Sequence, residues 1–150
     1  MTDHHYATSL AWTGSTSSGY AAYGRAHDVR FSEDVLTLSA DEAFRGDPAL
    51  PNPEQLLLAA VSSCQLLSFL ALAALERVDV VSYRDDAAAV MPAGAEPMRI
   101  TRIDLAPRVQ VRGADRDEVV RLIHRAHDTC YVANSLSAEV VVAPSIEVLP

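Results

Sequence analysis

A helix begins within the stretch Asn52-Pro53-Glu54-Gln55-Leu56-Leu57-Leu58-Ala59-Ala60-Val61-Ser62-Ser63-Cys64. Asn52 is a good N-cap, Pro53 suits the first helical position, and Gln55 stands where a capping box places its amide. The apolar run that follows predicts a helix to about residue 77, roughly 36 Å long. Cys64, one of the two cysteines of the chain, therefore lies in the middle of a long helix.

The absence of charge between residues 56 and 75 allows two interpretations of this helix. An apolar run of this length is long enough to span a membrane. Gln65 and three serines interrupt it, however, and the segments on either side are predicted strands rather than further spans. We therefore interpret it as a helix buried on every side in a soluble protein that does not enter a membrane.

The segments around this helix have the pattern of a mixed α+β domain. Alternating or β-rich composition predicts strands in residues 6–12, 20–31, 35–38, 80–90, 98–112 and 137–142. Pro107 predicts a bend or bulge in the fifth of these strands, and Pro144 follows the last. The order is βββ-α-ββ-α-β, with two core helices on an antiparallel sheet. A chain of 150 residues suits a single domain over 1–150.

A second helix is expected after residue 115, and it brings the other cysteine to the core. Asp115 and Glu118 form an Asp-x-x-Glu cap for this helix. Its apolar positions, at i, i+4, i+7 and i+11, form one stripe: Val119, Ile123, Ala126 and Cys130. Both helices should face the core, so the sulfurs of Cys64 and Cys130 can meet despite their distance in sequence.

Composition excludes several function classes. The formal charge is −8, and all twelve basic residues are arginines. Without lysine there is no Schiff-base chemistry and no phosphate-binding loop of the kind whose lysine reaches the nucleotide. An acidic chain without a basic block also argues against nucleic acid as a partner.

The N-terminus lacks the basic and apolar regions of a secretory signal, so we expect the protein in the cytoplasm. A cysteine pair in that compartment is more often catalytic, redox-sensing or metal-binding than a structural disulfide. A reactive thiolate needs a cation beside it, and Arg45, just before the first helix, is the best-placed guanidinium. Glu54 in the first turn could hold that guanidinium by a bidentate pair.

One geometric constraint affects this grouping of residues. Glu54 and Cys64 are ten residues apart on one helix, about 15 Å along its axis, and cannot touch within a straight helix. If two chains pack antiparallel with their helices crossing near Ala59 and Ala60, Glu54 of one chain moves beside Cys64 of the other. We therefore expect a homodimer with shared active sites.

With these two helices, the chain resembles the OsmC/Ohr family of organic-hydroperoxide and osmotically induced peroxidases. Residues 52–64 are similar to the family's Asn-Pro-Glu-(Glu/Gln)-Leu helix start, with the peroxidatic cysteine ten residues after the glutamate. Residues 126–136, Ala126-His127-Asp128-Thr129-Cys130-Tyr131-Val132-Ala133-Asn134-Ser135-Leu136, are similar to its resolving-cysteine segment. The order of the elements also matches, so the resemblance covers nearly the whole chain.

The resemblance implies a thiol peroxidase in which Cys64 attacks the peroxide and Cys130 resolves the product. It makes Glu54 the carboxylate that positions an arginine. It also implies an intertwined homodimer, no metal or organic cofactor, and reduction by an external thiol such as a dihydrolipoyl group. A buried thiolate in an apolar pocket favours an organic hydroperoxide over hydrogen peroxide.

The chain departs from the family at positions that bear on this interpretation. Tyr131 stands where proline usually follows the resolving cysteine, and Gln65 stands where an aromatic residue is commoner. Arg45 is close to the family's arginine position, with Arg30 and Arg25 as the other candidates. These departures point to a different branch of the family, and they concern substrate preference more than redox chemistry.

Two other functions fit parts of the pattern. His124, His127 and Cys130, with Cys64 as a fourth ligand, could form a tetrahedral metal site, although positions three apart drift around a helix. A non-catalytic binding module on the same fold would retain the pocket and leave both cysteines idle.

Overall fold

The computed structural model describes residues 2–150, which form two compact units. The first unit ends at Leu56 and the second runs from Leu57 to Pro150. The expectation of a single domain over 1–150 stays a prediction.

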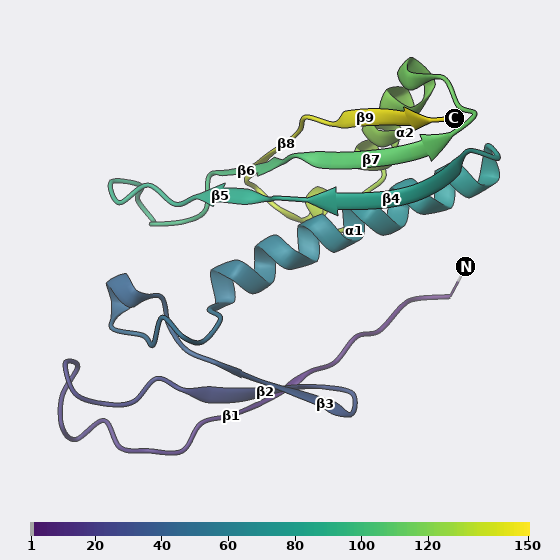
Figure 1. The fold of residues 1–150 in the computed structure, drawn as a ribbon. Coiled ribbons are helices and arrows are strands. Elements are labelled where there is room, and N and C mark those ends of the chain that lie inside the picture. The colour runs from purple at the N-terminus through teal and green to yellow at the C-terminus, as the bar shows by residue number, and fades with distance from the viewer. Residues whose placement is uncertain (1) are drawn as a thin grey trace. The chain divides into compact units, whose positions relative to one another are not determined.

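The first unit contains a three-stranded antiparallel sheet in the order β1-β2-β3 (Figure 1). Its strands are β1 (Ser9–Ala11), β2 (His27–Phe31) and β3 (Asp34–Leu38). The strand expected over 20–31 is shorter than predicted. Residues 20–26 form turns and irregular chain instead. Just before them, Gly19 takes a positive φ of 82° and donates its N–H to the Thr16 carbonyl. Val29 and Leu38 are the buried apolar residues of this sheet.

A short 3₁₀ helix, η1 (Glu42–Phe44), precedes the long helix. The Asp41 side chain accepts from the N–H of Ala43, and the Asp41 carbonyl accepts from the N–H of Gly46 at 3.0 Å. Gly46 is required here, since a Cβ at that position would lie 1.6 Å from the Ala40 carbonyl oxygen. The loop that holds Arg45 is therefore closed by its own hydrogen bonds.

Helix α1 (Pro53–Leu75) begins as the sequence predicted. The Gln55 N–H donates to Asn52 Oδ1 at 2.8 Å, and the Asn52 N–H donates to Gln55 Oε1 at 3.0 Å. This is the reciprocal capping box. At the other end Arg77 adopts a positive φ of 62°, and the N–H of Val78 donates to the Ala73 carbonyl at 2.8 Å, so the helix stops two residues before the predicted end.

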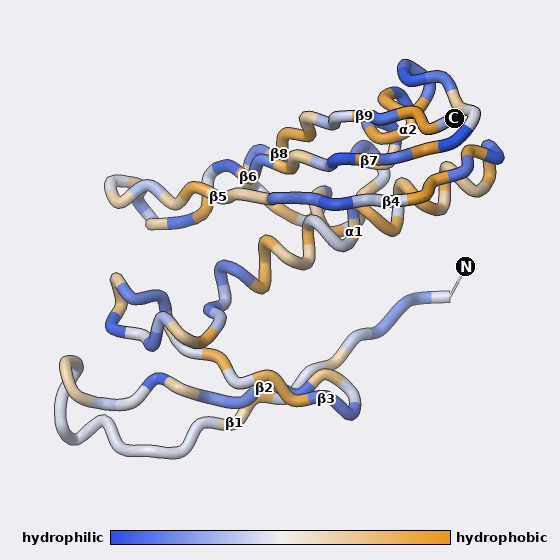
Figure 2. The backbone as a smooth tube through the Cα atoms, in the orientation of Figure 1, coloured by the Kyte–Doolittle hydropathy of each residue, from blue (hydrophilic) through white to orange (hydrophobic). Residues whose placement is uncertain are grey.

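The faces of α1 differ in burial although its residues are apolar all round. Figure 2 shows apolar residues on successive turns. Within the chain the helix buries one stripe, made of Val61, Gln65, Phe69 and Ala73. Leu67 and Leu75 are 63% and 78% exposed. By length and composition alone α1 qualifies as a membrane span.

The second unit contains two three-stranded sheets, and the chain passes back and forth between them (Figure 1). One has the order β4-β7-β9, made of β4 (Asp79–Asp85), β7 (Pro107–Arg112) and β9 (Ser145–Leu149). The other has the order β5-β6-β8, made of β5 (Ala88–Val90), β6 (Arg102–Leu105) and β8 (Glu139–Val142). Each long strand expected from the sequence is thus divided in two. The expected bend at Pro107 is confirmed as the break between β6 and β7.

The sheets are mixed rather than wholly antiparallel. β4 pairs antiparallel with β7, and β5 with β6, whereas β7–β9 and β6–β8 are parallel pairs. The parallel pairs arise because α2 (Arg116–Asp128) lies between β7 and β8 in the chain and returns it to the same end of the sheet. The predicted antiparallel sheet is corrected in this respect.

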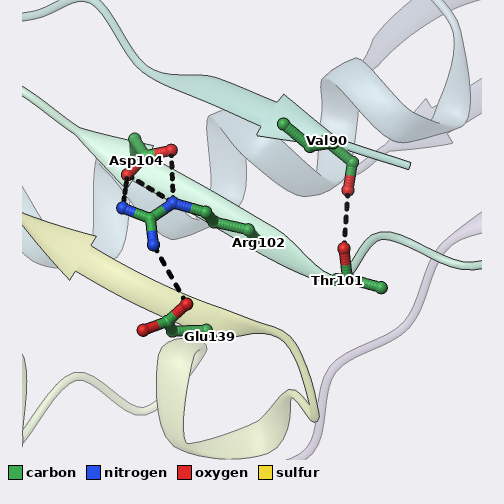
Figure 3. A network of polar contacts seen from close by, with 5 residues as sticks. All are labelled: Val90, Thr101, Arg102, Asp104 and Glu139. Carbon is green, nitrogen blue, oxygen red and sulfur yellow. Dashed lines mark hydrogen bonds and ion pairs between the residues drawn. The ribbon is translucent and has the colours of Figure 1, made fainter. Parts of the chain in front are cut away.

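An exposed ion-pair network marks the register of β6 and β8 (Figure 3). The Arg102 guanidinium donates to both carboxylate oxygens of Asp104 and, at 3.0 Å, to Glu139, its register partner on β8. Nearby, the Thr101 hydroxyl donates to the Val90 carbonyl at 3.4 Å. Water competes for pairs this exposed, so the network specifies register more than it adds stability.

Helix α2 confirms the predicted stripe. Asp115 caps its first turn by accepting from the Glu118 N–H at 3.0 Å. All four stripe residues are fully buried, and the last of them, Cys130, lies just past the end of the helix. On β7, Val109 and Val111 are buried while Arg108 and Arg112 are exposed, so one face of the sheet meets the core.

Candidate active site

The second unit brings the two cysteines together. Cys64 is half-buried in the middle of α1, and Cys130 is buried in the turn between α2 and the 3₁₀ helix η2 (Ala133–Ser135). Both are free thiols, and the Cys130 side chain acts as a hydrogen-bond partner of Cys64. This placement agrees with the expectation that the two sulfurs, although remote in sequence, meet in one core region.

Hydrogen bonding favours the thiolate at Cys64. Burial raises the pKa of the Cys64 thiol, but four hydrogen bonds together outweigh burial and leave the pKa below that of an ordinary cysteine. In decreasing order, the donors are the N–H of Val132, the Cys130 thiol, the N–H of Tyr131 and the Ser68 hydroxyl. Cys64 is therefore the sulfur suited to nucleophilic attack.

The pKa of the Cys130 thiol is shifted in the opposite direction, above that of an ordinary cysteine. Burial is the main cause that raises the pKa of Cys130, and the neighbouring Cys64 raises it further. The N–H groups of Ala133 and Val132 act against this rise without overcoming it. Cys64 therefore ionises at a lower pH than Cys130, which matches a resolving thiol beside an attacking one.

The turn after α2 provides the backbone donors. The N–H of Cys130 donates to the His127 carbonyl at 3.1 Å, and the N–H of Asn134 donates to the Cys130 carbonyl at 3.0 Å. Between these two bonds, the N–H groups of Tyr131 and Val132 are directed to Cys64. The Tyr131 side chain is 82% exposed, so this residue contributes to the site through its backbone. Proline, which the resemblance leads one to expect there, has no N–H to donate.

Ser68 and these amide donors were missed by the sequence reasoning. Ser68 lies four positions after Cys64, a spacing that places both side chains on one face of a helix, so its signal was present. Backbone amides have no signature in side-chain patterns. The donors from residues 131 and 132 could be found only from the conformation of the turn.

A buried polar group lies directly beside the cysteine on α1. The side chain of Gln65 is wholly buried, and its Nε2 donates to the Ile123 carbonyl on α2 at 3.0 Å. Its Oε1 is buried without a partner among residues 2–150, at a cost of about 1–3 kcal/mol. The Tyr83 hydroxyl is also buried and unpartnered within that range, and burial, then Asp85, then Cys130 raise the pKa of this phenol.

Glu54 and Arg45 belong to the first unit, and their position beside Cys64 stays a prediction. Glu54 is half-buried, and its Oε2 has no hydrogen-bond partner among the described residues. Arg45 is exposed, with a positive φ of 64° at the C-cap of η1. Within residues 2–150 no ion pair joins these two side chains.

Arg25 is the arginine that the first unit holds most firmly. Its guanidinium lies over the rings of Tyr20 and Tyr23, 4.8 and 4.0 Å from their centroids, and donates to the carbonyls of both residues. It lines an apolar cavity of about 610 Å³ that also includes Pro53, the residue before Glu54. Arg30, the other candidate, is exposed on β2.

The rival metal site is not assembled in the described part of the chain. Among residues 2–150, no group of three or more His, Cys, Asp or Glu side chains is arranged to hold a metal ion. His124 is exposed, and His127 is half-buried. The series 124, 127 and 130 drifts around the helical period, and Cys130 lies past the end of α2.

Comparison with known proteins supports a single family. A model of the family described as OsmC-like protein matches residues 46–145. An OsmC-like protein of unknown function from Vibrio cholerae is 28% identical, with a TM-score of 0.85 over 95% of this chain and 100% of that chain. No curated protein matches the chain.

Two less similar structures share the fold. An organic hydroperoxide resistance protein from Legionella pneumophila is 20% identical, with a TM-score of 0.67 over 97% of this chain and 99% of that one. A putative organic hydroperoxide resistance protein from Vibrio cholerae, with captopril bound in one of its active sites, is 21% identical. Its TM-score is 0.69, over 96% of this chain and 93% of that one.

Proposed function

Because the chain belongs to the family of OsmC-like proteins, we propose that it is a thiol-dependent peroxidase that reduces organic hydroperoxides through Cys64 and Cys130. The observation that carries the proposal is the pairing of two thiols with opposite tendencies to ionise. A lowered pKa at Cys64 provides the nucleophile, and the protonated Cys130 beside it provides the resolving group. Two proteins with this fold are described as an organic hydroperoxide resistance protein and a putative one, which agrees with the proposal.

The reaction runs in two steps at these sulfurs. The Cys64 thiolate attacks a peroxide oxygen, the O–O bond breaks, and the alkoxide leaves as an alcohol after taking up a proton. Cys64 is then a sulfenic acid. Cys130 condenses with it to a disulfide and releases water, and an external dithiol, such as a dihydrolipoyl group, restores both thiols by exchange. This cycle needs no metal or organic cofactor, and a reducing cytoplasm suits it.

An organic substrate also agrees with an apolar cavity in the first unit. The first unit holds a cavity of a size that suits a small organic molecule, lined mainly by aromatic and aliphatic side chains. Arg25 is fixed on its wall, so within the proposal it is a stronger candidate than the exposed Arg45 for the cation that Glu54 positions. Replacing each arginine with methionine and measuring peroxide turnover distinguishes the two candidates.

We further propose that the working form is a homodimer whose active sites lie at the interface. Helix α1 exposes Leu67, Leu70 and Leu75. In this proposal a second copy of α1 buries these leucines in the dimer interface. The unpartnered Glu54 oxygen fits a contact that a partner chain completes. Sedimentation equilibrium should give twice the chain mass, and a stable monomer would contradict the shared site.

Turnover is the direct test of the proposed activity. With dihydrolipoamide as reductant, the wild-type chain should consume cumene hydroperoxide catalytically, and Cys64→Ser should abolish this consumption. Hydrogen peroxide should be the poorer substrate. If Cys64→Ser consumes peroxide as fast as the wild type, the peroxidase proposal is wrong. A wild-type chain that consumes none would favour a non-catalytic binding module.

A further inference from the structure

The buried amide of Gln65 has no part in the cycle described above. Gln65 follows Cys64 directly, and none of its side chain is exposed. The Nε2 donates to the Ile123 carbonyl at 3.0 Å, while Oε1 is buried and unpartnered in the described part of the chain. A methionine of similar volume would leave no acceptor unpaired. Packing alone therefore does not account for a glutamine at this position.

The bond from Gln65 connects the two helices that carry the cysteines. Its donor end is on α1, one residue from Cys64. Its acceptor, the Ile123 carbonyl, is on α2, and Cys130 follows seven positions later, just past the end of that helix. A directional bond at this point fixes α2 along α1. It therefore fixes where the Cys130 sulfur lies relative to the Cys64 sulfur.

A second bond joins neighbouring segments at the surface and provides a matched comparison. Arg125 on α2 donates to Glu76, just past the end of α1, at 3.1 Å. These side chains are 54% and 45% exposed, so water competes for both partners. The Gln65 bond is shielded from water and is the firmer of the two connections.

We propose that Gln65 is a positioning residue for the attack of Cys130 on oxidised Cys64, an inference that rests on the proposed function. In this step the Cys130 sulfur bonds to the Cys64 sulfur, and the S–O bond of the sulfenic acid breaks. The leaving hydroxide takes the Cys130 proton and departs as water. Attack must run in line with the bond that breaks, so a small shift of α2 slows this step. The preceding attack of Cys64 on the peroxide does not involve α2 in this way.

Two variants separate this role from a general effect on structure: Gln65→Met removes the buried bond, and Arg125→Met removes the exposed one. Each protein is mixed with cumene hydroperoxide, quenched at intervals and examined by mass spectrometry for loss of the Cys64 thiol and for disulfide formation. We expect Gln65→Met to form the disulfide about tenfold or more slowly than the wild type. In this variant the rate at which Cys64 attacks the peroxide should change by less than about twofold. The sulfenic acid that accumulates on Cys64 should be trapped by dimedone. Arg125→Met should match the wild type in both steps.

A urea titration accompanies these rates, and the midpoint of Gln65→Met should equal or exceed that of the wild type. If methionine prevents folding, Gln65→Leu serves the same purpose. Disulfide formation at the wild-type rate in the folded variant would overturn the proposal, and so would equal slowing of both steps.

A parallel series with diamide, which oxidises thiol pairs without a peroxide, keeps this test independent of the peroxidase proposal. If the wild type forms the disulfide with diamide but not with peroxide, the proposed peroxidase activity is wrong. In that case slower diamide-driven disulfide formation in Gln65→Met would still support the positioning role, and an unchanged rate would refute it.

Discussion

Replacing Asp85 with alanine should destabilise the protein far more than replacing its neighbour Asp86. Asp85 ends β4 and accepts two hydrogen bonds, from the Ser62 hydroxyl on α1 at 2.5 Å and from the Ala106 N–H between β6 and β7 at 2.8 Å. Each hydrogen bond to a charged acceptor contributes about 1.5–3 kcal/mol. Because Asp85 is half-buried, water replaces part of that loss, and we expect the free energy of unfolding to fall by about 2–4 kcal/mol.

Asp86 provides the control, since its carboxylate pairs with Arg108 and both side chains are largely exposed, at 72% and 61%. Asp86→Ala should lower the free energy of unfolding by less than about 1 kcal/mol. Asp85→Asn keeps an acceptor for the Ala106 amide and should fall between the two. Urea unfolding followed by circular dichroism, at one protein concentration, measures all three variants. If the free energies of unfolding of Asp85→Ala and Asp86→Ala differ by less than about 0.5 kcal/mol, the assigned role of Asp85 is wrong.

Other predictions concern the site and the core. Phe69→Ala should lower the free energy of unfolding by about 3–5 kcal/mol in urea, because the ring is fully buried. Iodoacetamide reacts with thiolates, and the pKa is lowered at Cys64 and raised at Cys130. Cys64 should therefore be alkylated at a lower pH than Cys130. The reverse order on peptide mapping would contradict the assigned roles. Tyr131→Pro removes one N–H donor and should shift the alkylation profile of Cys64 to higher pH, whereas Tyr131→Ala should leave it unchanged. Ser68→Ala should shift it in the same direction by losing a hydroxyl donor, and an unaltered profile would exclude Ser68 from the site.

Local patterns in the sequence predicted the local structure well. The reciprocal bonds of Asn52 and Gln55 follow from residue types at fixed spacing, and the buried stripe of α2 follows from the helical period. Pro107 similarly marked the break in its strand. In each case the determining interaction lies within a few residues along the chain.

Features that depend on distant segments were not predictable in this way. The parallel pairing of β7 with β9 depends on how α2 returns the chain to the sheet, which the strand pattern does not encode. The partner of Gln65 is a backbone carbonyl 58 positions away, and every residue has such a carbonyl. Tyr131 was expected to concern substrate preference more than redox chemistry, whereas its N–H is a hydrogen-bond donor that lowers the pKa of Cys64.

Oxidation of the reduced protein with one equivalent of cumene hydroperoxide tests most directly whether these two thiols act as a pair. We predict rapid loss of both thiols, a mass decrease of about 2 Da, and a tryptic peptide in which Cys64 is joined to Cys130 within one chain. Two titratable thiols that survive this treatment, or a disulfide formed only between chains, would contradict the account.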